Sequence, residues 1–213
     1  MELKINEIYY SIQGESSFMG KPCIFIRLTY CNLRCSYCDS EYTFYEGKNM
    51  KISTILKEIE KYPCDLVEVT GGEPLFQKNC IHLLNELVRK KYNILLETGG
   101  SLSIKEVPKE VINIIDFKCP SSKMSKKNLW ENVNYIKQKD EIKFVIGNRE
   151  DYEWSKNKML EYKLNTKCEV IFSPVYNVIE PKRIVDWILK DNLNVRFQIQ
   201  LHKEIWPESE KGV

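Results

Sequence analysis

Short apolar runs alternate with amphipathic helical segments along most of this chain, and the alternation limits the fold more than any other feature. The run Leu66–Thr70, for example, is followed by Ile81–Lys91, in which Leu84, Leu87 and Val88 share one helical face. Repeated strand-then-helix units favour a parallel sheet joined by right-handed crossovers. We therefore predict an α/β fold with a compact, mostly parallel sheet.

The same patterns place the individual elements. Strands are expected at Lys4–Ile12, Cys23–Tyr30, Leu66–Thr70, Asn93–Glu97, Val111–Phe117, Ile142–Ile146, Cys168–Phe172 and Val195–Leu201. Helices are expected at Ile52–Tyr62 with Ser53 as its cap, Ile81–Lys91, Leu129–Lys137, Asp151–Leu164 and Ile184–Leu189, the last opened by Pro181. No internal repeat or linker rich in proline and glycine interrupts this order, so residues 1–213 are expected to form a single domain.

Composition limits the location and the partners. The net charge is only +2 with lysines and acids interspersed, which gives no sign of a nucleic-acid surface. No apolar run approaches the length of a membrane span, and Met1–Asn6 lacks the hydrophobic core of a signal peptide. We expect a cytoplasmic, reducing location with no membrane or nucleic-acid partner. There the eight cysteines would be metal ligands or buried thiols rather than disulfides.

Three of these cysteines fall in one short segment, Cys31-Asn32-Leu33-Arg34-Cys35-Ser36-Tyr37-Cys38. The segment follows a predicted strand, where open α/β folds bind ligands. No Cys or His nearby could complete a mononuclear zinc site. Three thiolates suit an iron–sulfur cubane with one iron left open to a small molecule, whereas electron-transfer clusters use four cysteines. The scattered cysteines are expected to be small buried hydrophobes: Cys23, Cys64, Cys80, Cys119 and Cys168.

Polar and glycine-rich segments follow the other predicted strands. The carboxyl ends of parallel strands share one edge of a sheet, so these segments are expected to meet the cysteine loop there. Each alone is an ordinary strand-to-helix turn, but together they are typical of a ligand site. They are Gly71–Pro74, Glu97–Gly100, Asp116–Ser121, Ser173–Tyr176 and His202.

The cysteine spacing, with Tyr37 before the last cysteine, resembles the cluster motif of radical S-adenosylmethionine (SAM) enzymes. Gly71-Gly72-Glu73-Pro74, directly after Thr70, resembles the segment of that superfamily that binds the methionyl amino group of SAM. The resemblance implies a partial (β/α) barrel of radical SAM type and a [4Fe–4S] cluster held by Cys31, Cys35 and Cys38. It also implies SAM on the open iron, where one electron cleaves it to methionine and a 5′-deoxyadenosyl radical.

A narrower resemblance runs through nearly the whole chain. The segments Ser11–Glu15, Arg27, Cys38–Ser40, Glu97–Gly99 and Gln200–Lys203 are together similar to the 7-carboxy-7-deazaguanine synthase family. This implies a carbon–nitrogen lyase that converts 6-carboxy-5,6,7,8-tetrahydropterin to 7-carboxy-7-deazaguanine with loss of ammonia, a step towards queuosine and other deazapurines. It further implies a homodimer. We expect flavodoxin or ferredoxin as the reductant, although the sequence does not name it.

The same resemblance assigns roles to single residues. The residues that it assigns to substrate binding are Ile12, Gln13, Gly14, Glu15, Arg27, Thr70, His202 and Val213. A guanidinium binds a carboxylate through two parallel hydrogen bonds, which suits Arg27 to the pterin carboxylate, although an ion pair at the rim is the alternative. The residues that it assigns to SAM binding are Tyr37, Cys38, Asp39, Gly71, Gly72, Glu73, Asp116, Phe117, Lys118, Ser173, Pro174, Val175 and Tyr176.

Ser40 departs from the family, whose members often have threonine two residues after the last cysteine. By resemblance, the hydroxyl at this position helps to hold Mg²⁺ against the substrate. Serine keeps that hydroxyl, and magnesium takes few protein ligands, so we expect the magnesium site to be retained. An ordinary turn serine is the alternative.

Two other classes of function stay open at this point. Another radical SAM enzyme, such as an activase of glycyl-radical enzymes, would share the cysteines and Gly71–Pro74 but would not need Gln13–Glu15 or Gln200–Lys203. A zinc or iron–sulfur binding module without enzymatic activity would use the cysteines alone and would leave the glycine-rich segments unexplained.

Overall fold

One nine-stranded sheet organises the computed structural model, which describes residues 1–206, 211 and 212. The strand order is β3-β1-β2-β4-β5-β6-β7-β8-β9. The two edge pairs β1·β2 and β1·β3 are antiparallel, and every neighbouring pair from β2 to β9 is parallel. The strands are β1 (Glu2–Ile12), β2 (Pro22–Leu28), β3 (Lys48–Lys51), β4 (Leu66–Gly71), β5 (Asn93–Thr98), β6 (Ile112–Asp116), β7 (Glu141–Ile146), β8 (Glu169–Pro174) and β9 (Arg196–Phe197).

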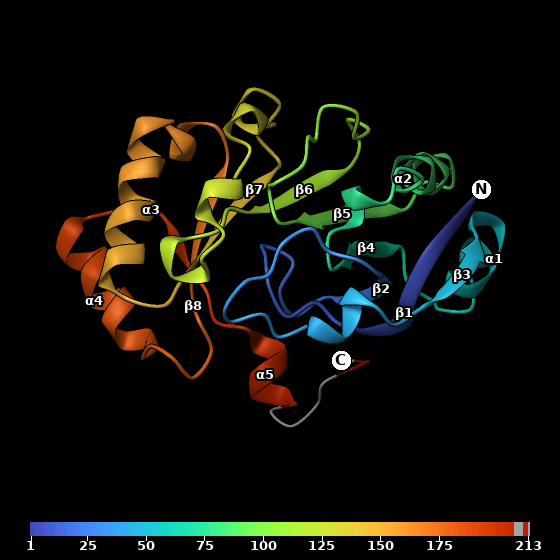
Figure 1. Ribbon diagram of the computed structural model, residues 1–213, viewed down its shortest axis with the longest axis horizontal. Coiled ribbons are helices and arrows are strands. Elements are labelled where there is room, and N and C mark those ends of the chain that lie inside the picture. Colours follow the sequence, from blue (N-terminus) through green and yellow to red (C-terminus); the bar gives the residue numbers. More distant parts are fainter. Residues whose placement is uncertain (207–210, 213) are drawn as a thin grey trace.

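Five α-helices accompany the sheet within the described residues (Figure 1). They are α1 (Ile52–Ile59), α2 (Cys80–Arg89), α3 (Arg149–Glu161), α4 (Pro181–Asp191) and α5 (Leu201–Ile205). The remaining helical segments are short 3₁₀ turns: η1 (Glu41–Phe44), η2 (Pro74–Phe76), η3 (Pro120–Ser122), η4 (Ser125–Lys127), η5 (Trp130–Asn134) and η6 (Leu164–Thr166). None of the helices in the described residues is long and apolar enough to cross a membrane.

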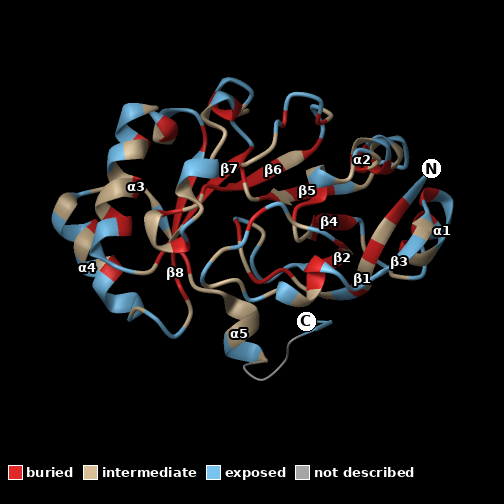
Figure 2. Cartoon of the chain, viewed as in Figure 1, coloured by how far each residue is buried: buried red, intermediate tan, exposed pale blue. Residues whose placement is uncertain are grey.

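Side-chain alternation gives the two faces of the sheet different roles. On the outer face, β-strand residues such as Ile26, Val69 and Phe144 pack with the apolar faces of α1 to α4 in one large core. Figure 2 shows this core as buried strands, with exposed residues on the far sides of the helices. The inner face carries a smaller apolar cluster: Tyr9, Cys23, Phe25, Leu66, Leu95 and Ile114.

Further along the same strands, towards their carboxyl ends, the inner face becomes polar. The alternation continues from Phe25 to Arg27 on β2 and from Leu95 to Glu97 on β5, and the same period places three more polar side chains on the inner face. These three are Glu68 on β4, Asp116 on β6 and Lys143 on β7. The inner face therefore has an apolar floor and a charged layer above it.

The loop that follows β1 crosses this inner face. The Gln13 side-chain amide donates a hydrogen bond to the Glu68 carboxyl on β4. Farther along the loop, the Ser17 backbone N–H donates to Glu141 on β7 at 3.1 Å. The loop is thus tied to strands from both halves of the sheet, and it places Gln13, Gly14 and Glu15 beside the charged layer.

The predicted fold class is confirmed. The sheet is mostly parallel and is not closed, as expected for a partial (β/α) barrel. The predicted strands and four of the five predicted helices are present, with ends shifted by a few residues. The prediction of Ser53 as a helix cap was wrong, because α1 begins at Ile52 with Lys51 in the capping position.

Two further segments differ from the sequence prediction. Leu129–Lys137 is not an α-helix but contains the 3₁₀ turn η5, because the Asn132 side chain donates to the Gly100 and Leu102 carbonyl oxygens and ties the segment to that loop. The predicted strand Val195–Leu201 shrinks to β9, because the Leu201 N–H donates to the Gly14 carbonyl at 2.9 Å and draws the chain away from β8 into α5.

The edge strand β3 was missed by sequence analysis. Its residues, Lys-Asn-Met-Lys, show no alternation of apolar and polar side chains, and three of the four are exposed. Such short, charged edge strands are common because they discourage pairing with other chains. Pairing with β1 alone places the segment in the sheet.

The outer core predicts a measurable difference between two leucines. Leu96→Ala, at a fully buried site on β5, is expected to lower the free energy of unfolding by about 2–5 kcal/mol through lost burial and a cavity. Leu189→Ala, at a site that is 68% exposed on α4, is the matched control and should change it by about 0.5 kcal/mol or less. Chemical denaturation of both variants measures this; equal losses would contradict the assignment of the core.

Candidate active site at the carboxyl edge of the sheet

A cavity of about 700 Å³ opens over the charged layer, at the carboxyl ends of the parallel strands. The structure brings the cysteine loop and all of the predicted polar segments to its wall. The predicted site residues that line it are Ile12, Gln13, Gly14, Glu15, Arg27, Cys31, Cys35, Tyr37, Cys38, Asp39, Ser40, Thr70, Gly71, Gly72, Asp116, Lys118, Val175, Tyr176 and His202.

Four predicted site residues do not line the cavity, and one lies outside the described residues. Phe117 lies in the outer core, where its ring stacks on Trp130 at 4.5 Å between centroids. Ser173 and Pro174 are buried at the end of β8. Glu73 is also buried, and Val213 is the residue outside the described part of the chain.

Glu73 uses its carboxylate inside the protein. It accepts hydrogen bonds from the Thr98 hydroxyl at 2.9 Å, the Gly99 N–H at 2.8 Å and the Leu75 N–H at 3.0 Å. These bonds join the end of β4 to the end of β5. In this structure Glu73 therefore fixes the shape of the rim.

The three clustered cysteines are free thiols on the cavity wall. Among the described residues, no three His, Cys, Asp or Glu side chains lie close enough together to hold a single metal ion. A cluster does not require that arrangement, because each thiolate binds a different iron atom. Burial raises the pKa of Cys35 to about 11, and a bound metal favours the thiolate, so loading with iron would reverse that shift. The donor set fits a cluster held by three cysteines.

The cysteine loop is fixed on two sides. The Ser36 N–H donates to the Ser122 carbonyl at 3.1 Å, and the Ser36 hydroxyl donates to the Ser121 carbonyl at 2.7 Å. Gly72 lets the end of β4 approach the loop from the other side. A Cβ at Gly72 would lie 2.4 Å from the Tyr30 carbonyl oxygen and 2.8 Å from the Cys31 Cβ, so no larger residue fits.

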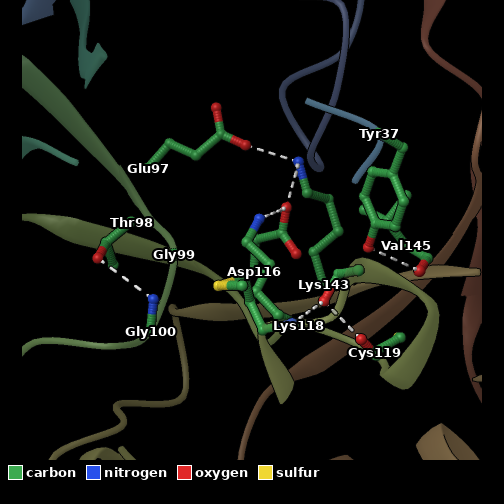
Figure 3. A network of polar contacts seen from close by, with 12 residues as sticks. Tyr37, Glu97, Thr98, Gly99, Gly100, Asp116, Lys118, Cys119, Lys143 and Val145 are labelled. Carbon is green, nitrogen blue, oxygen red and sulfur yellow. Dashed lines mark hydrogen bonds and ion pairs between the residues drawn. The ribbon is translucent and has the colours of Figure 1, made fainter. Parts of the chain in front are cut away.

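Lys143 is the centre of the charged layer. Its ammonium pairs with Glu15, lies 2.6 Å from a Glu97 carboxylate oxygen and lies 3.7 Å from Asp116 (Figure 3). Lys118 pairs with the same Asp116 oxygen at 2.8 Å. Burial alone would lower the pKa of Lys143, but its three carboxylate neighbours raise it well above the ordinary lysine value. Lys143 is therefore charged at neutral pH.

The neighbouring carboxyl groups differ in pKa. Burial alone would raise the pKa of Glu15, but Lys143 lowers it to about 2. Burial, with the charges of Glu97 and Glu15 nearby, raises the pKa of Glu68 well above the ordinary value, so Glu68 is protonated more readily than Glu15. The second Asp116 oxygen, Oδ1, is buried and has no hydrogen-bond partner in the described part of the chain, which leaves it to accept a hydrogen bond from a ligand.

Arg27 lies at the side of the cavity nearest β1. Its Nε pairs with Glu7 at 2.7 Å, and its Nη2 donates to the Tyr9 hydroxyl at 2.6 Å. Within the described residues, the Nη1 group makes no hydrogen bond. Arg27 thus forms the ion pair that the sequence left as an alternative, and it keeps one donor group for an anion.

The first turn of α5 closes over the loop that follows β1. Gln200 donates from its amide to Glu15 at 2.7 Å, and a Cβ at Gly14 would lie 2.1 Å from the Nδ1 atom of His202. Glycine is therefore required at position 14 for His202 to keep its place. Beside this contact, Lys203 pairs with Asp39 at 2.6 Å, which joins α5 to the cysteine loop.

A second cavity, of about 630 Å³, lies at the opposite, amino-terminal ends of β4 and β5. Its wall includes Tyr10, Phe18, Lys21 and Cys64 and none of the predicted site segments. The groups able to bind an iron–sulfur cluster, an anion and a polar ring therefore gather in the first cavity.

Comparisons with known proteins agree with this geometry. The family model described as the Radical SAM superfamily matches residues 25–118. The 7-carboxy-7-deazaguanine synthase of Koribacter versatilis is 43% identical over 226 residues, which cover 99% of this chain and all of that protein. This chain belongs to the 7-carboxy-7-deazaguanine synthase family.

A second relative and a solved structure support the assignment of this chain to the family. The 7-carboxy-7-deazaguanine synthase of Chlorobaculum tepidum is 42% identical over 214 residues, which cover 99% of this chain and 97% of that protein. The crystal structure of QueE from Escherichia coli matches with a TM-score of 0.80 over 95% of both chains at 21% identity, and so shows the same fold. These comparisons do not favour the alternative of another radical SAM enzyme such as a glycyl-radical enzyme activase.

Glu68, Glu97 and Lys143 are among the cavity residues to which the sequence assigned no binding role. A signal was present for two of them. Glu68 and Lys143 are ionisable side chains in the middle of apolar strands, where a buried ionisable group needs a partner. Glu97 was placed at the rim, but nothing in the sequence pointed to its partner.

The packing of His202 predicts a titration that can be measured. Burial disfavours the imidazolium ion and outweighs the attraction of Glu15, so the pKa of His202 is lowered and protonation requires a more acidic solution. Proton NMR of the two histidines, assigned with His82→Gln, should place His202 below the ordinary value of about 6.5. Gly14→Ala displaces the ring and should move this pKa back up; an unchanged titration would contradict the predicted contact.

Proposed function

We propose that this protein is a radical SAM enzyme that converts 6-carboxy-5,6,7,8-tetrahydropterin to 7-carboxy-7-deazaguanine with loss of ammonia. One observation carries the proposal beyond family membership. The three thiols and an arginine with a free donor group lie on the wall of one cavity, at the end of the same strand, β2. A cluster-bound reagent and an anionic substrate would therefore meet in that cavity.

The superfamily implies a [4Fe–4S] cluster and SAM, and the cavity fits both. Cys31, Cys35 and Cys38 would hold the cluster. The free Asp116 oxygen and the close backbone at Gly72 fit SAM, which carries hydroxyl and amino donors. When bound, the cluster and SAM supply a 5′-deoxyadenosyl radical that takes a hydrogen atom from the substrate.

The other cavity residues would bind and orient the pterin. Arg27, held by Glu7 and Tyr9, would bind its carboxylate with the free Nη1 group. Glu15, fixed by Lys143 and Gln200, offers an ionised acceptor for the N–H groups of the pterin ring. The raised pKa of Glu68 favours its neutral form, which would lower the negative charge of a cavity that must admit an anionic substrate. This fixed geometry would hold the substrate through a ring rearrangement.

Magnesium, the reductant and the assembly state belong to the proposal as well. Ser40 lines the cavity next to Asp39 and would supply a hydroxyl to Mg²⁺, whose other ligands would be substrate and water. An electron from flavodoxin or ferredoxin, a homodimer, a single domain over residues 1–213 and a cytoplasmic location stay predictions from the sequence.

The experiment that tests the function is anaerobic incubation of the reconstituted protein with the pterin, SAM, Mg²⁺ and dithionite. Formation of 7-carboxy-7-deazaguanine, identified by mass spectrometry, is the expected result. A protein with an intact cluster that forms none would refute the proposal. Stoichiometric zinc in place of iron and sulfide would instead support the non-enzymatic binding module.

The cysteine assignment makes a prediction that does not depend on turnover. Cys35→Ala should fail to bind a stable cluster, so that iron after reconstitution falls well below about four atoms per chain and the visible absorption band is lost. Cys64→Ala, in the second cavity, is the matched control and should keep both. Full iron content in Cys35→Ala would remove this cysteine from the ligand set.

The arginine assignment predicts a loss of substrate binding. Arg27→Gln removes a charged hydrogen bond worth about 1.5–3 kcal/mol, so KM for the pterin should rise roughly 10- to 100-fold. The effect on kcat should be smaller if the contact exists equally in the ground and transition states. Arg196→Gln, which breaks an exposed ion pair with Glu169 outside the cavity, is the control. An unchanged KM in Arg27→Gln would contradict the role.

A further inference from the structure

We propose that Lys143 is a positioning residue that couples the binding of the pterin to the binding of SAM. The inference rests on the proposed function. Lys143 lies on the inner face of β7, and its ammonium is shared by carboxylates from three separate segments. These are Glu15 in the loop after β1, Glu97 at the end of β5 and Asp116 at the end of β6.

The geometry makes Lys143 the link between these segments. Its side chain is only 5% exposed, and Figure 3 shows its ammonium between Glu97 and Asp116. Lys118, a partly buried lysine that also lines the cavity, pairs with Asp116 alone among the described residues. Lys143 is thus the cation that joins Asp116 to both Glu15 and Glu97 in the described part of the chain.

The three carboxylates belong to two different binding regions. Glu15 is a proposed pterin contact, as are Gln13 and Gly14 before it. Glu97 accepts a hydrogen bond at 3.4 Å from the hydroxyl of Thr70, another proposed pterin contact. Asp116 pairs with Lys118 and keeps one free oxygen, and these two residues are proposed SAM contacts. Lys143 therefore stands where the two regions meet.

A shared ammonium gives a physical route for coupling. A pterin that hydrogen-bonds to Glu15 or Glu97 fixes those carboxylates, and through Lys143 it also fixes Asp116. The conformational ordering that SAM would otherwise require is then already present, so SAM binds more tightly. Thermodynamic linkage requires the converse, so SAM must strengthen pterin binding by the same factor.

A purely structural role makes a different prediction. If Lys143 only neutralises buried carboxylates, its loss lowers stability and weakens each ligand by a constant factor. The ratio of the two pterin dissociation constants, measured without and with SAM, would then stay as in the wild type. This ratio is therefore the quantity that separates the two roles.

The test is anaerobic calorimetry of pterin binding to the reconstituted protein, with and without saturating SAM and with no reductant, so that no turnover occurs. In the wild type, SAM should lower the Kd of the pterin at least about 5-fold. Lys143→Arg keeps the charge and should retain most of the coupling, whereas Lys143→Gln should bring the ratio close to one. Lys156→Gln is the control, because Lys156 also pairs with two carboxylates, Glu153 and Asp191, but lies on α3 outside the cavity.

Each outcome decides a point. Two outcomes overturn the inference and leave the proposed function standing. In the first, SAM lowers the Kd of the pterin for Lys143→Gln as much as it does for the wild type. In the second, the wild type binds both ligands but SAM does not change its Kd for the pterin. A wild-type protein with an intact cluster that binds neither ligand refutes the proposed function, and the inference with it.

If thermal melting shows that Lys143→Gln does not fold, the double variant Lys143→Gln/Glu97→Gln replaces it, because that pair of substitutions removes one buried carboxylate together with the ammonium. In the double variant the ratio of the pterin Kd without and with SAM should also be close to one. A ratio equal to that of the wild type would again overturn the inference.

Discussion

Buried charges must be paired, and on the inner face of this sheet Lys143 meets that requirement for three carboxylates at once. The arrangement depends on strand periodicity, which points every second residue inward, and on the parallel register. That register pairs Asp116 with Lys143 and places Glu97 opposite Ile114, one inward-facing position before Asp116 on β6. The loop after β1 supplies Glu15 and completes the group. The resulting charged layer separates an apolar floor from an open cavity.

That layer gives the cavity its chemical character. The cysteine loop offers three thiols to the cavity, and Arg27 offers a donor group to an anion. Backbone contacts hold these parts in place: Gly72 packs against the cysteine loop, and the Leu201 N–H bonds to Gly14 so that α5 covers the cavity. A reactive radical needs such a site, because fixed geometry limits which hydrogen atom it can reach.

The sequence alone predicted the parallel sheet and the gathering of polar segments at its carboxyl edge, because strand periodicity and the cysteine spacing are local signals. It did not predict where the chain leaves the sheet, since the end of β9 is set by the distant bond from Leu201 to Gly14. The role of Lys143 was missed for the same reason, because its partners come from segments far apart in the chain. Glu73 was assigned to SAM from its motif, whereas its carboxylate bonds to the end of β5.

The central claim is that a hydrogen atom passes from a pterin in this cavity to the 5′-deoxyadenosyl group of SAM. The most direct test is anaerobic turnover with 6-carboxytetrahydropterin deuterated at the carbons of its reduced ring, followed by mass spectrometry of the nucleosides. Deuterium in the 5′-deoxyadenosyl group, recovered as SAM or as 5′-deoxyadenosine, is the predicted result. Formation of 7-carboxy-7-deazaguanine with no deuterium in that group would contradict the account.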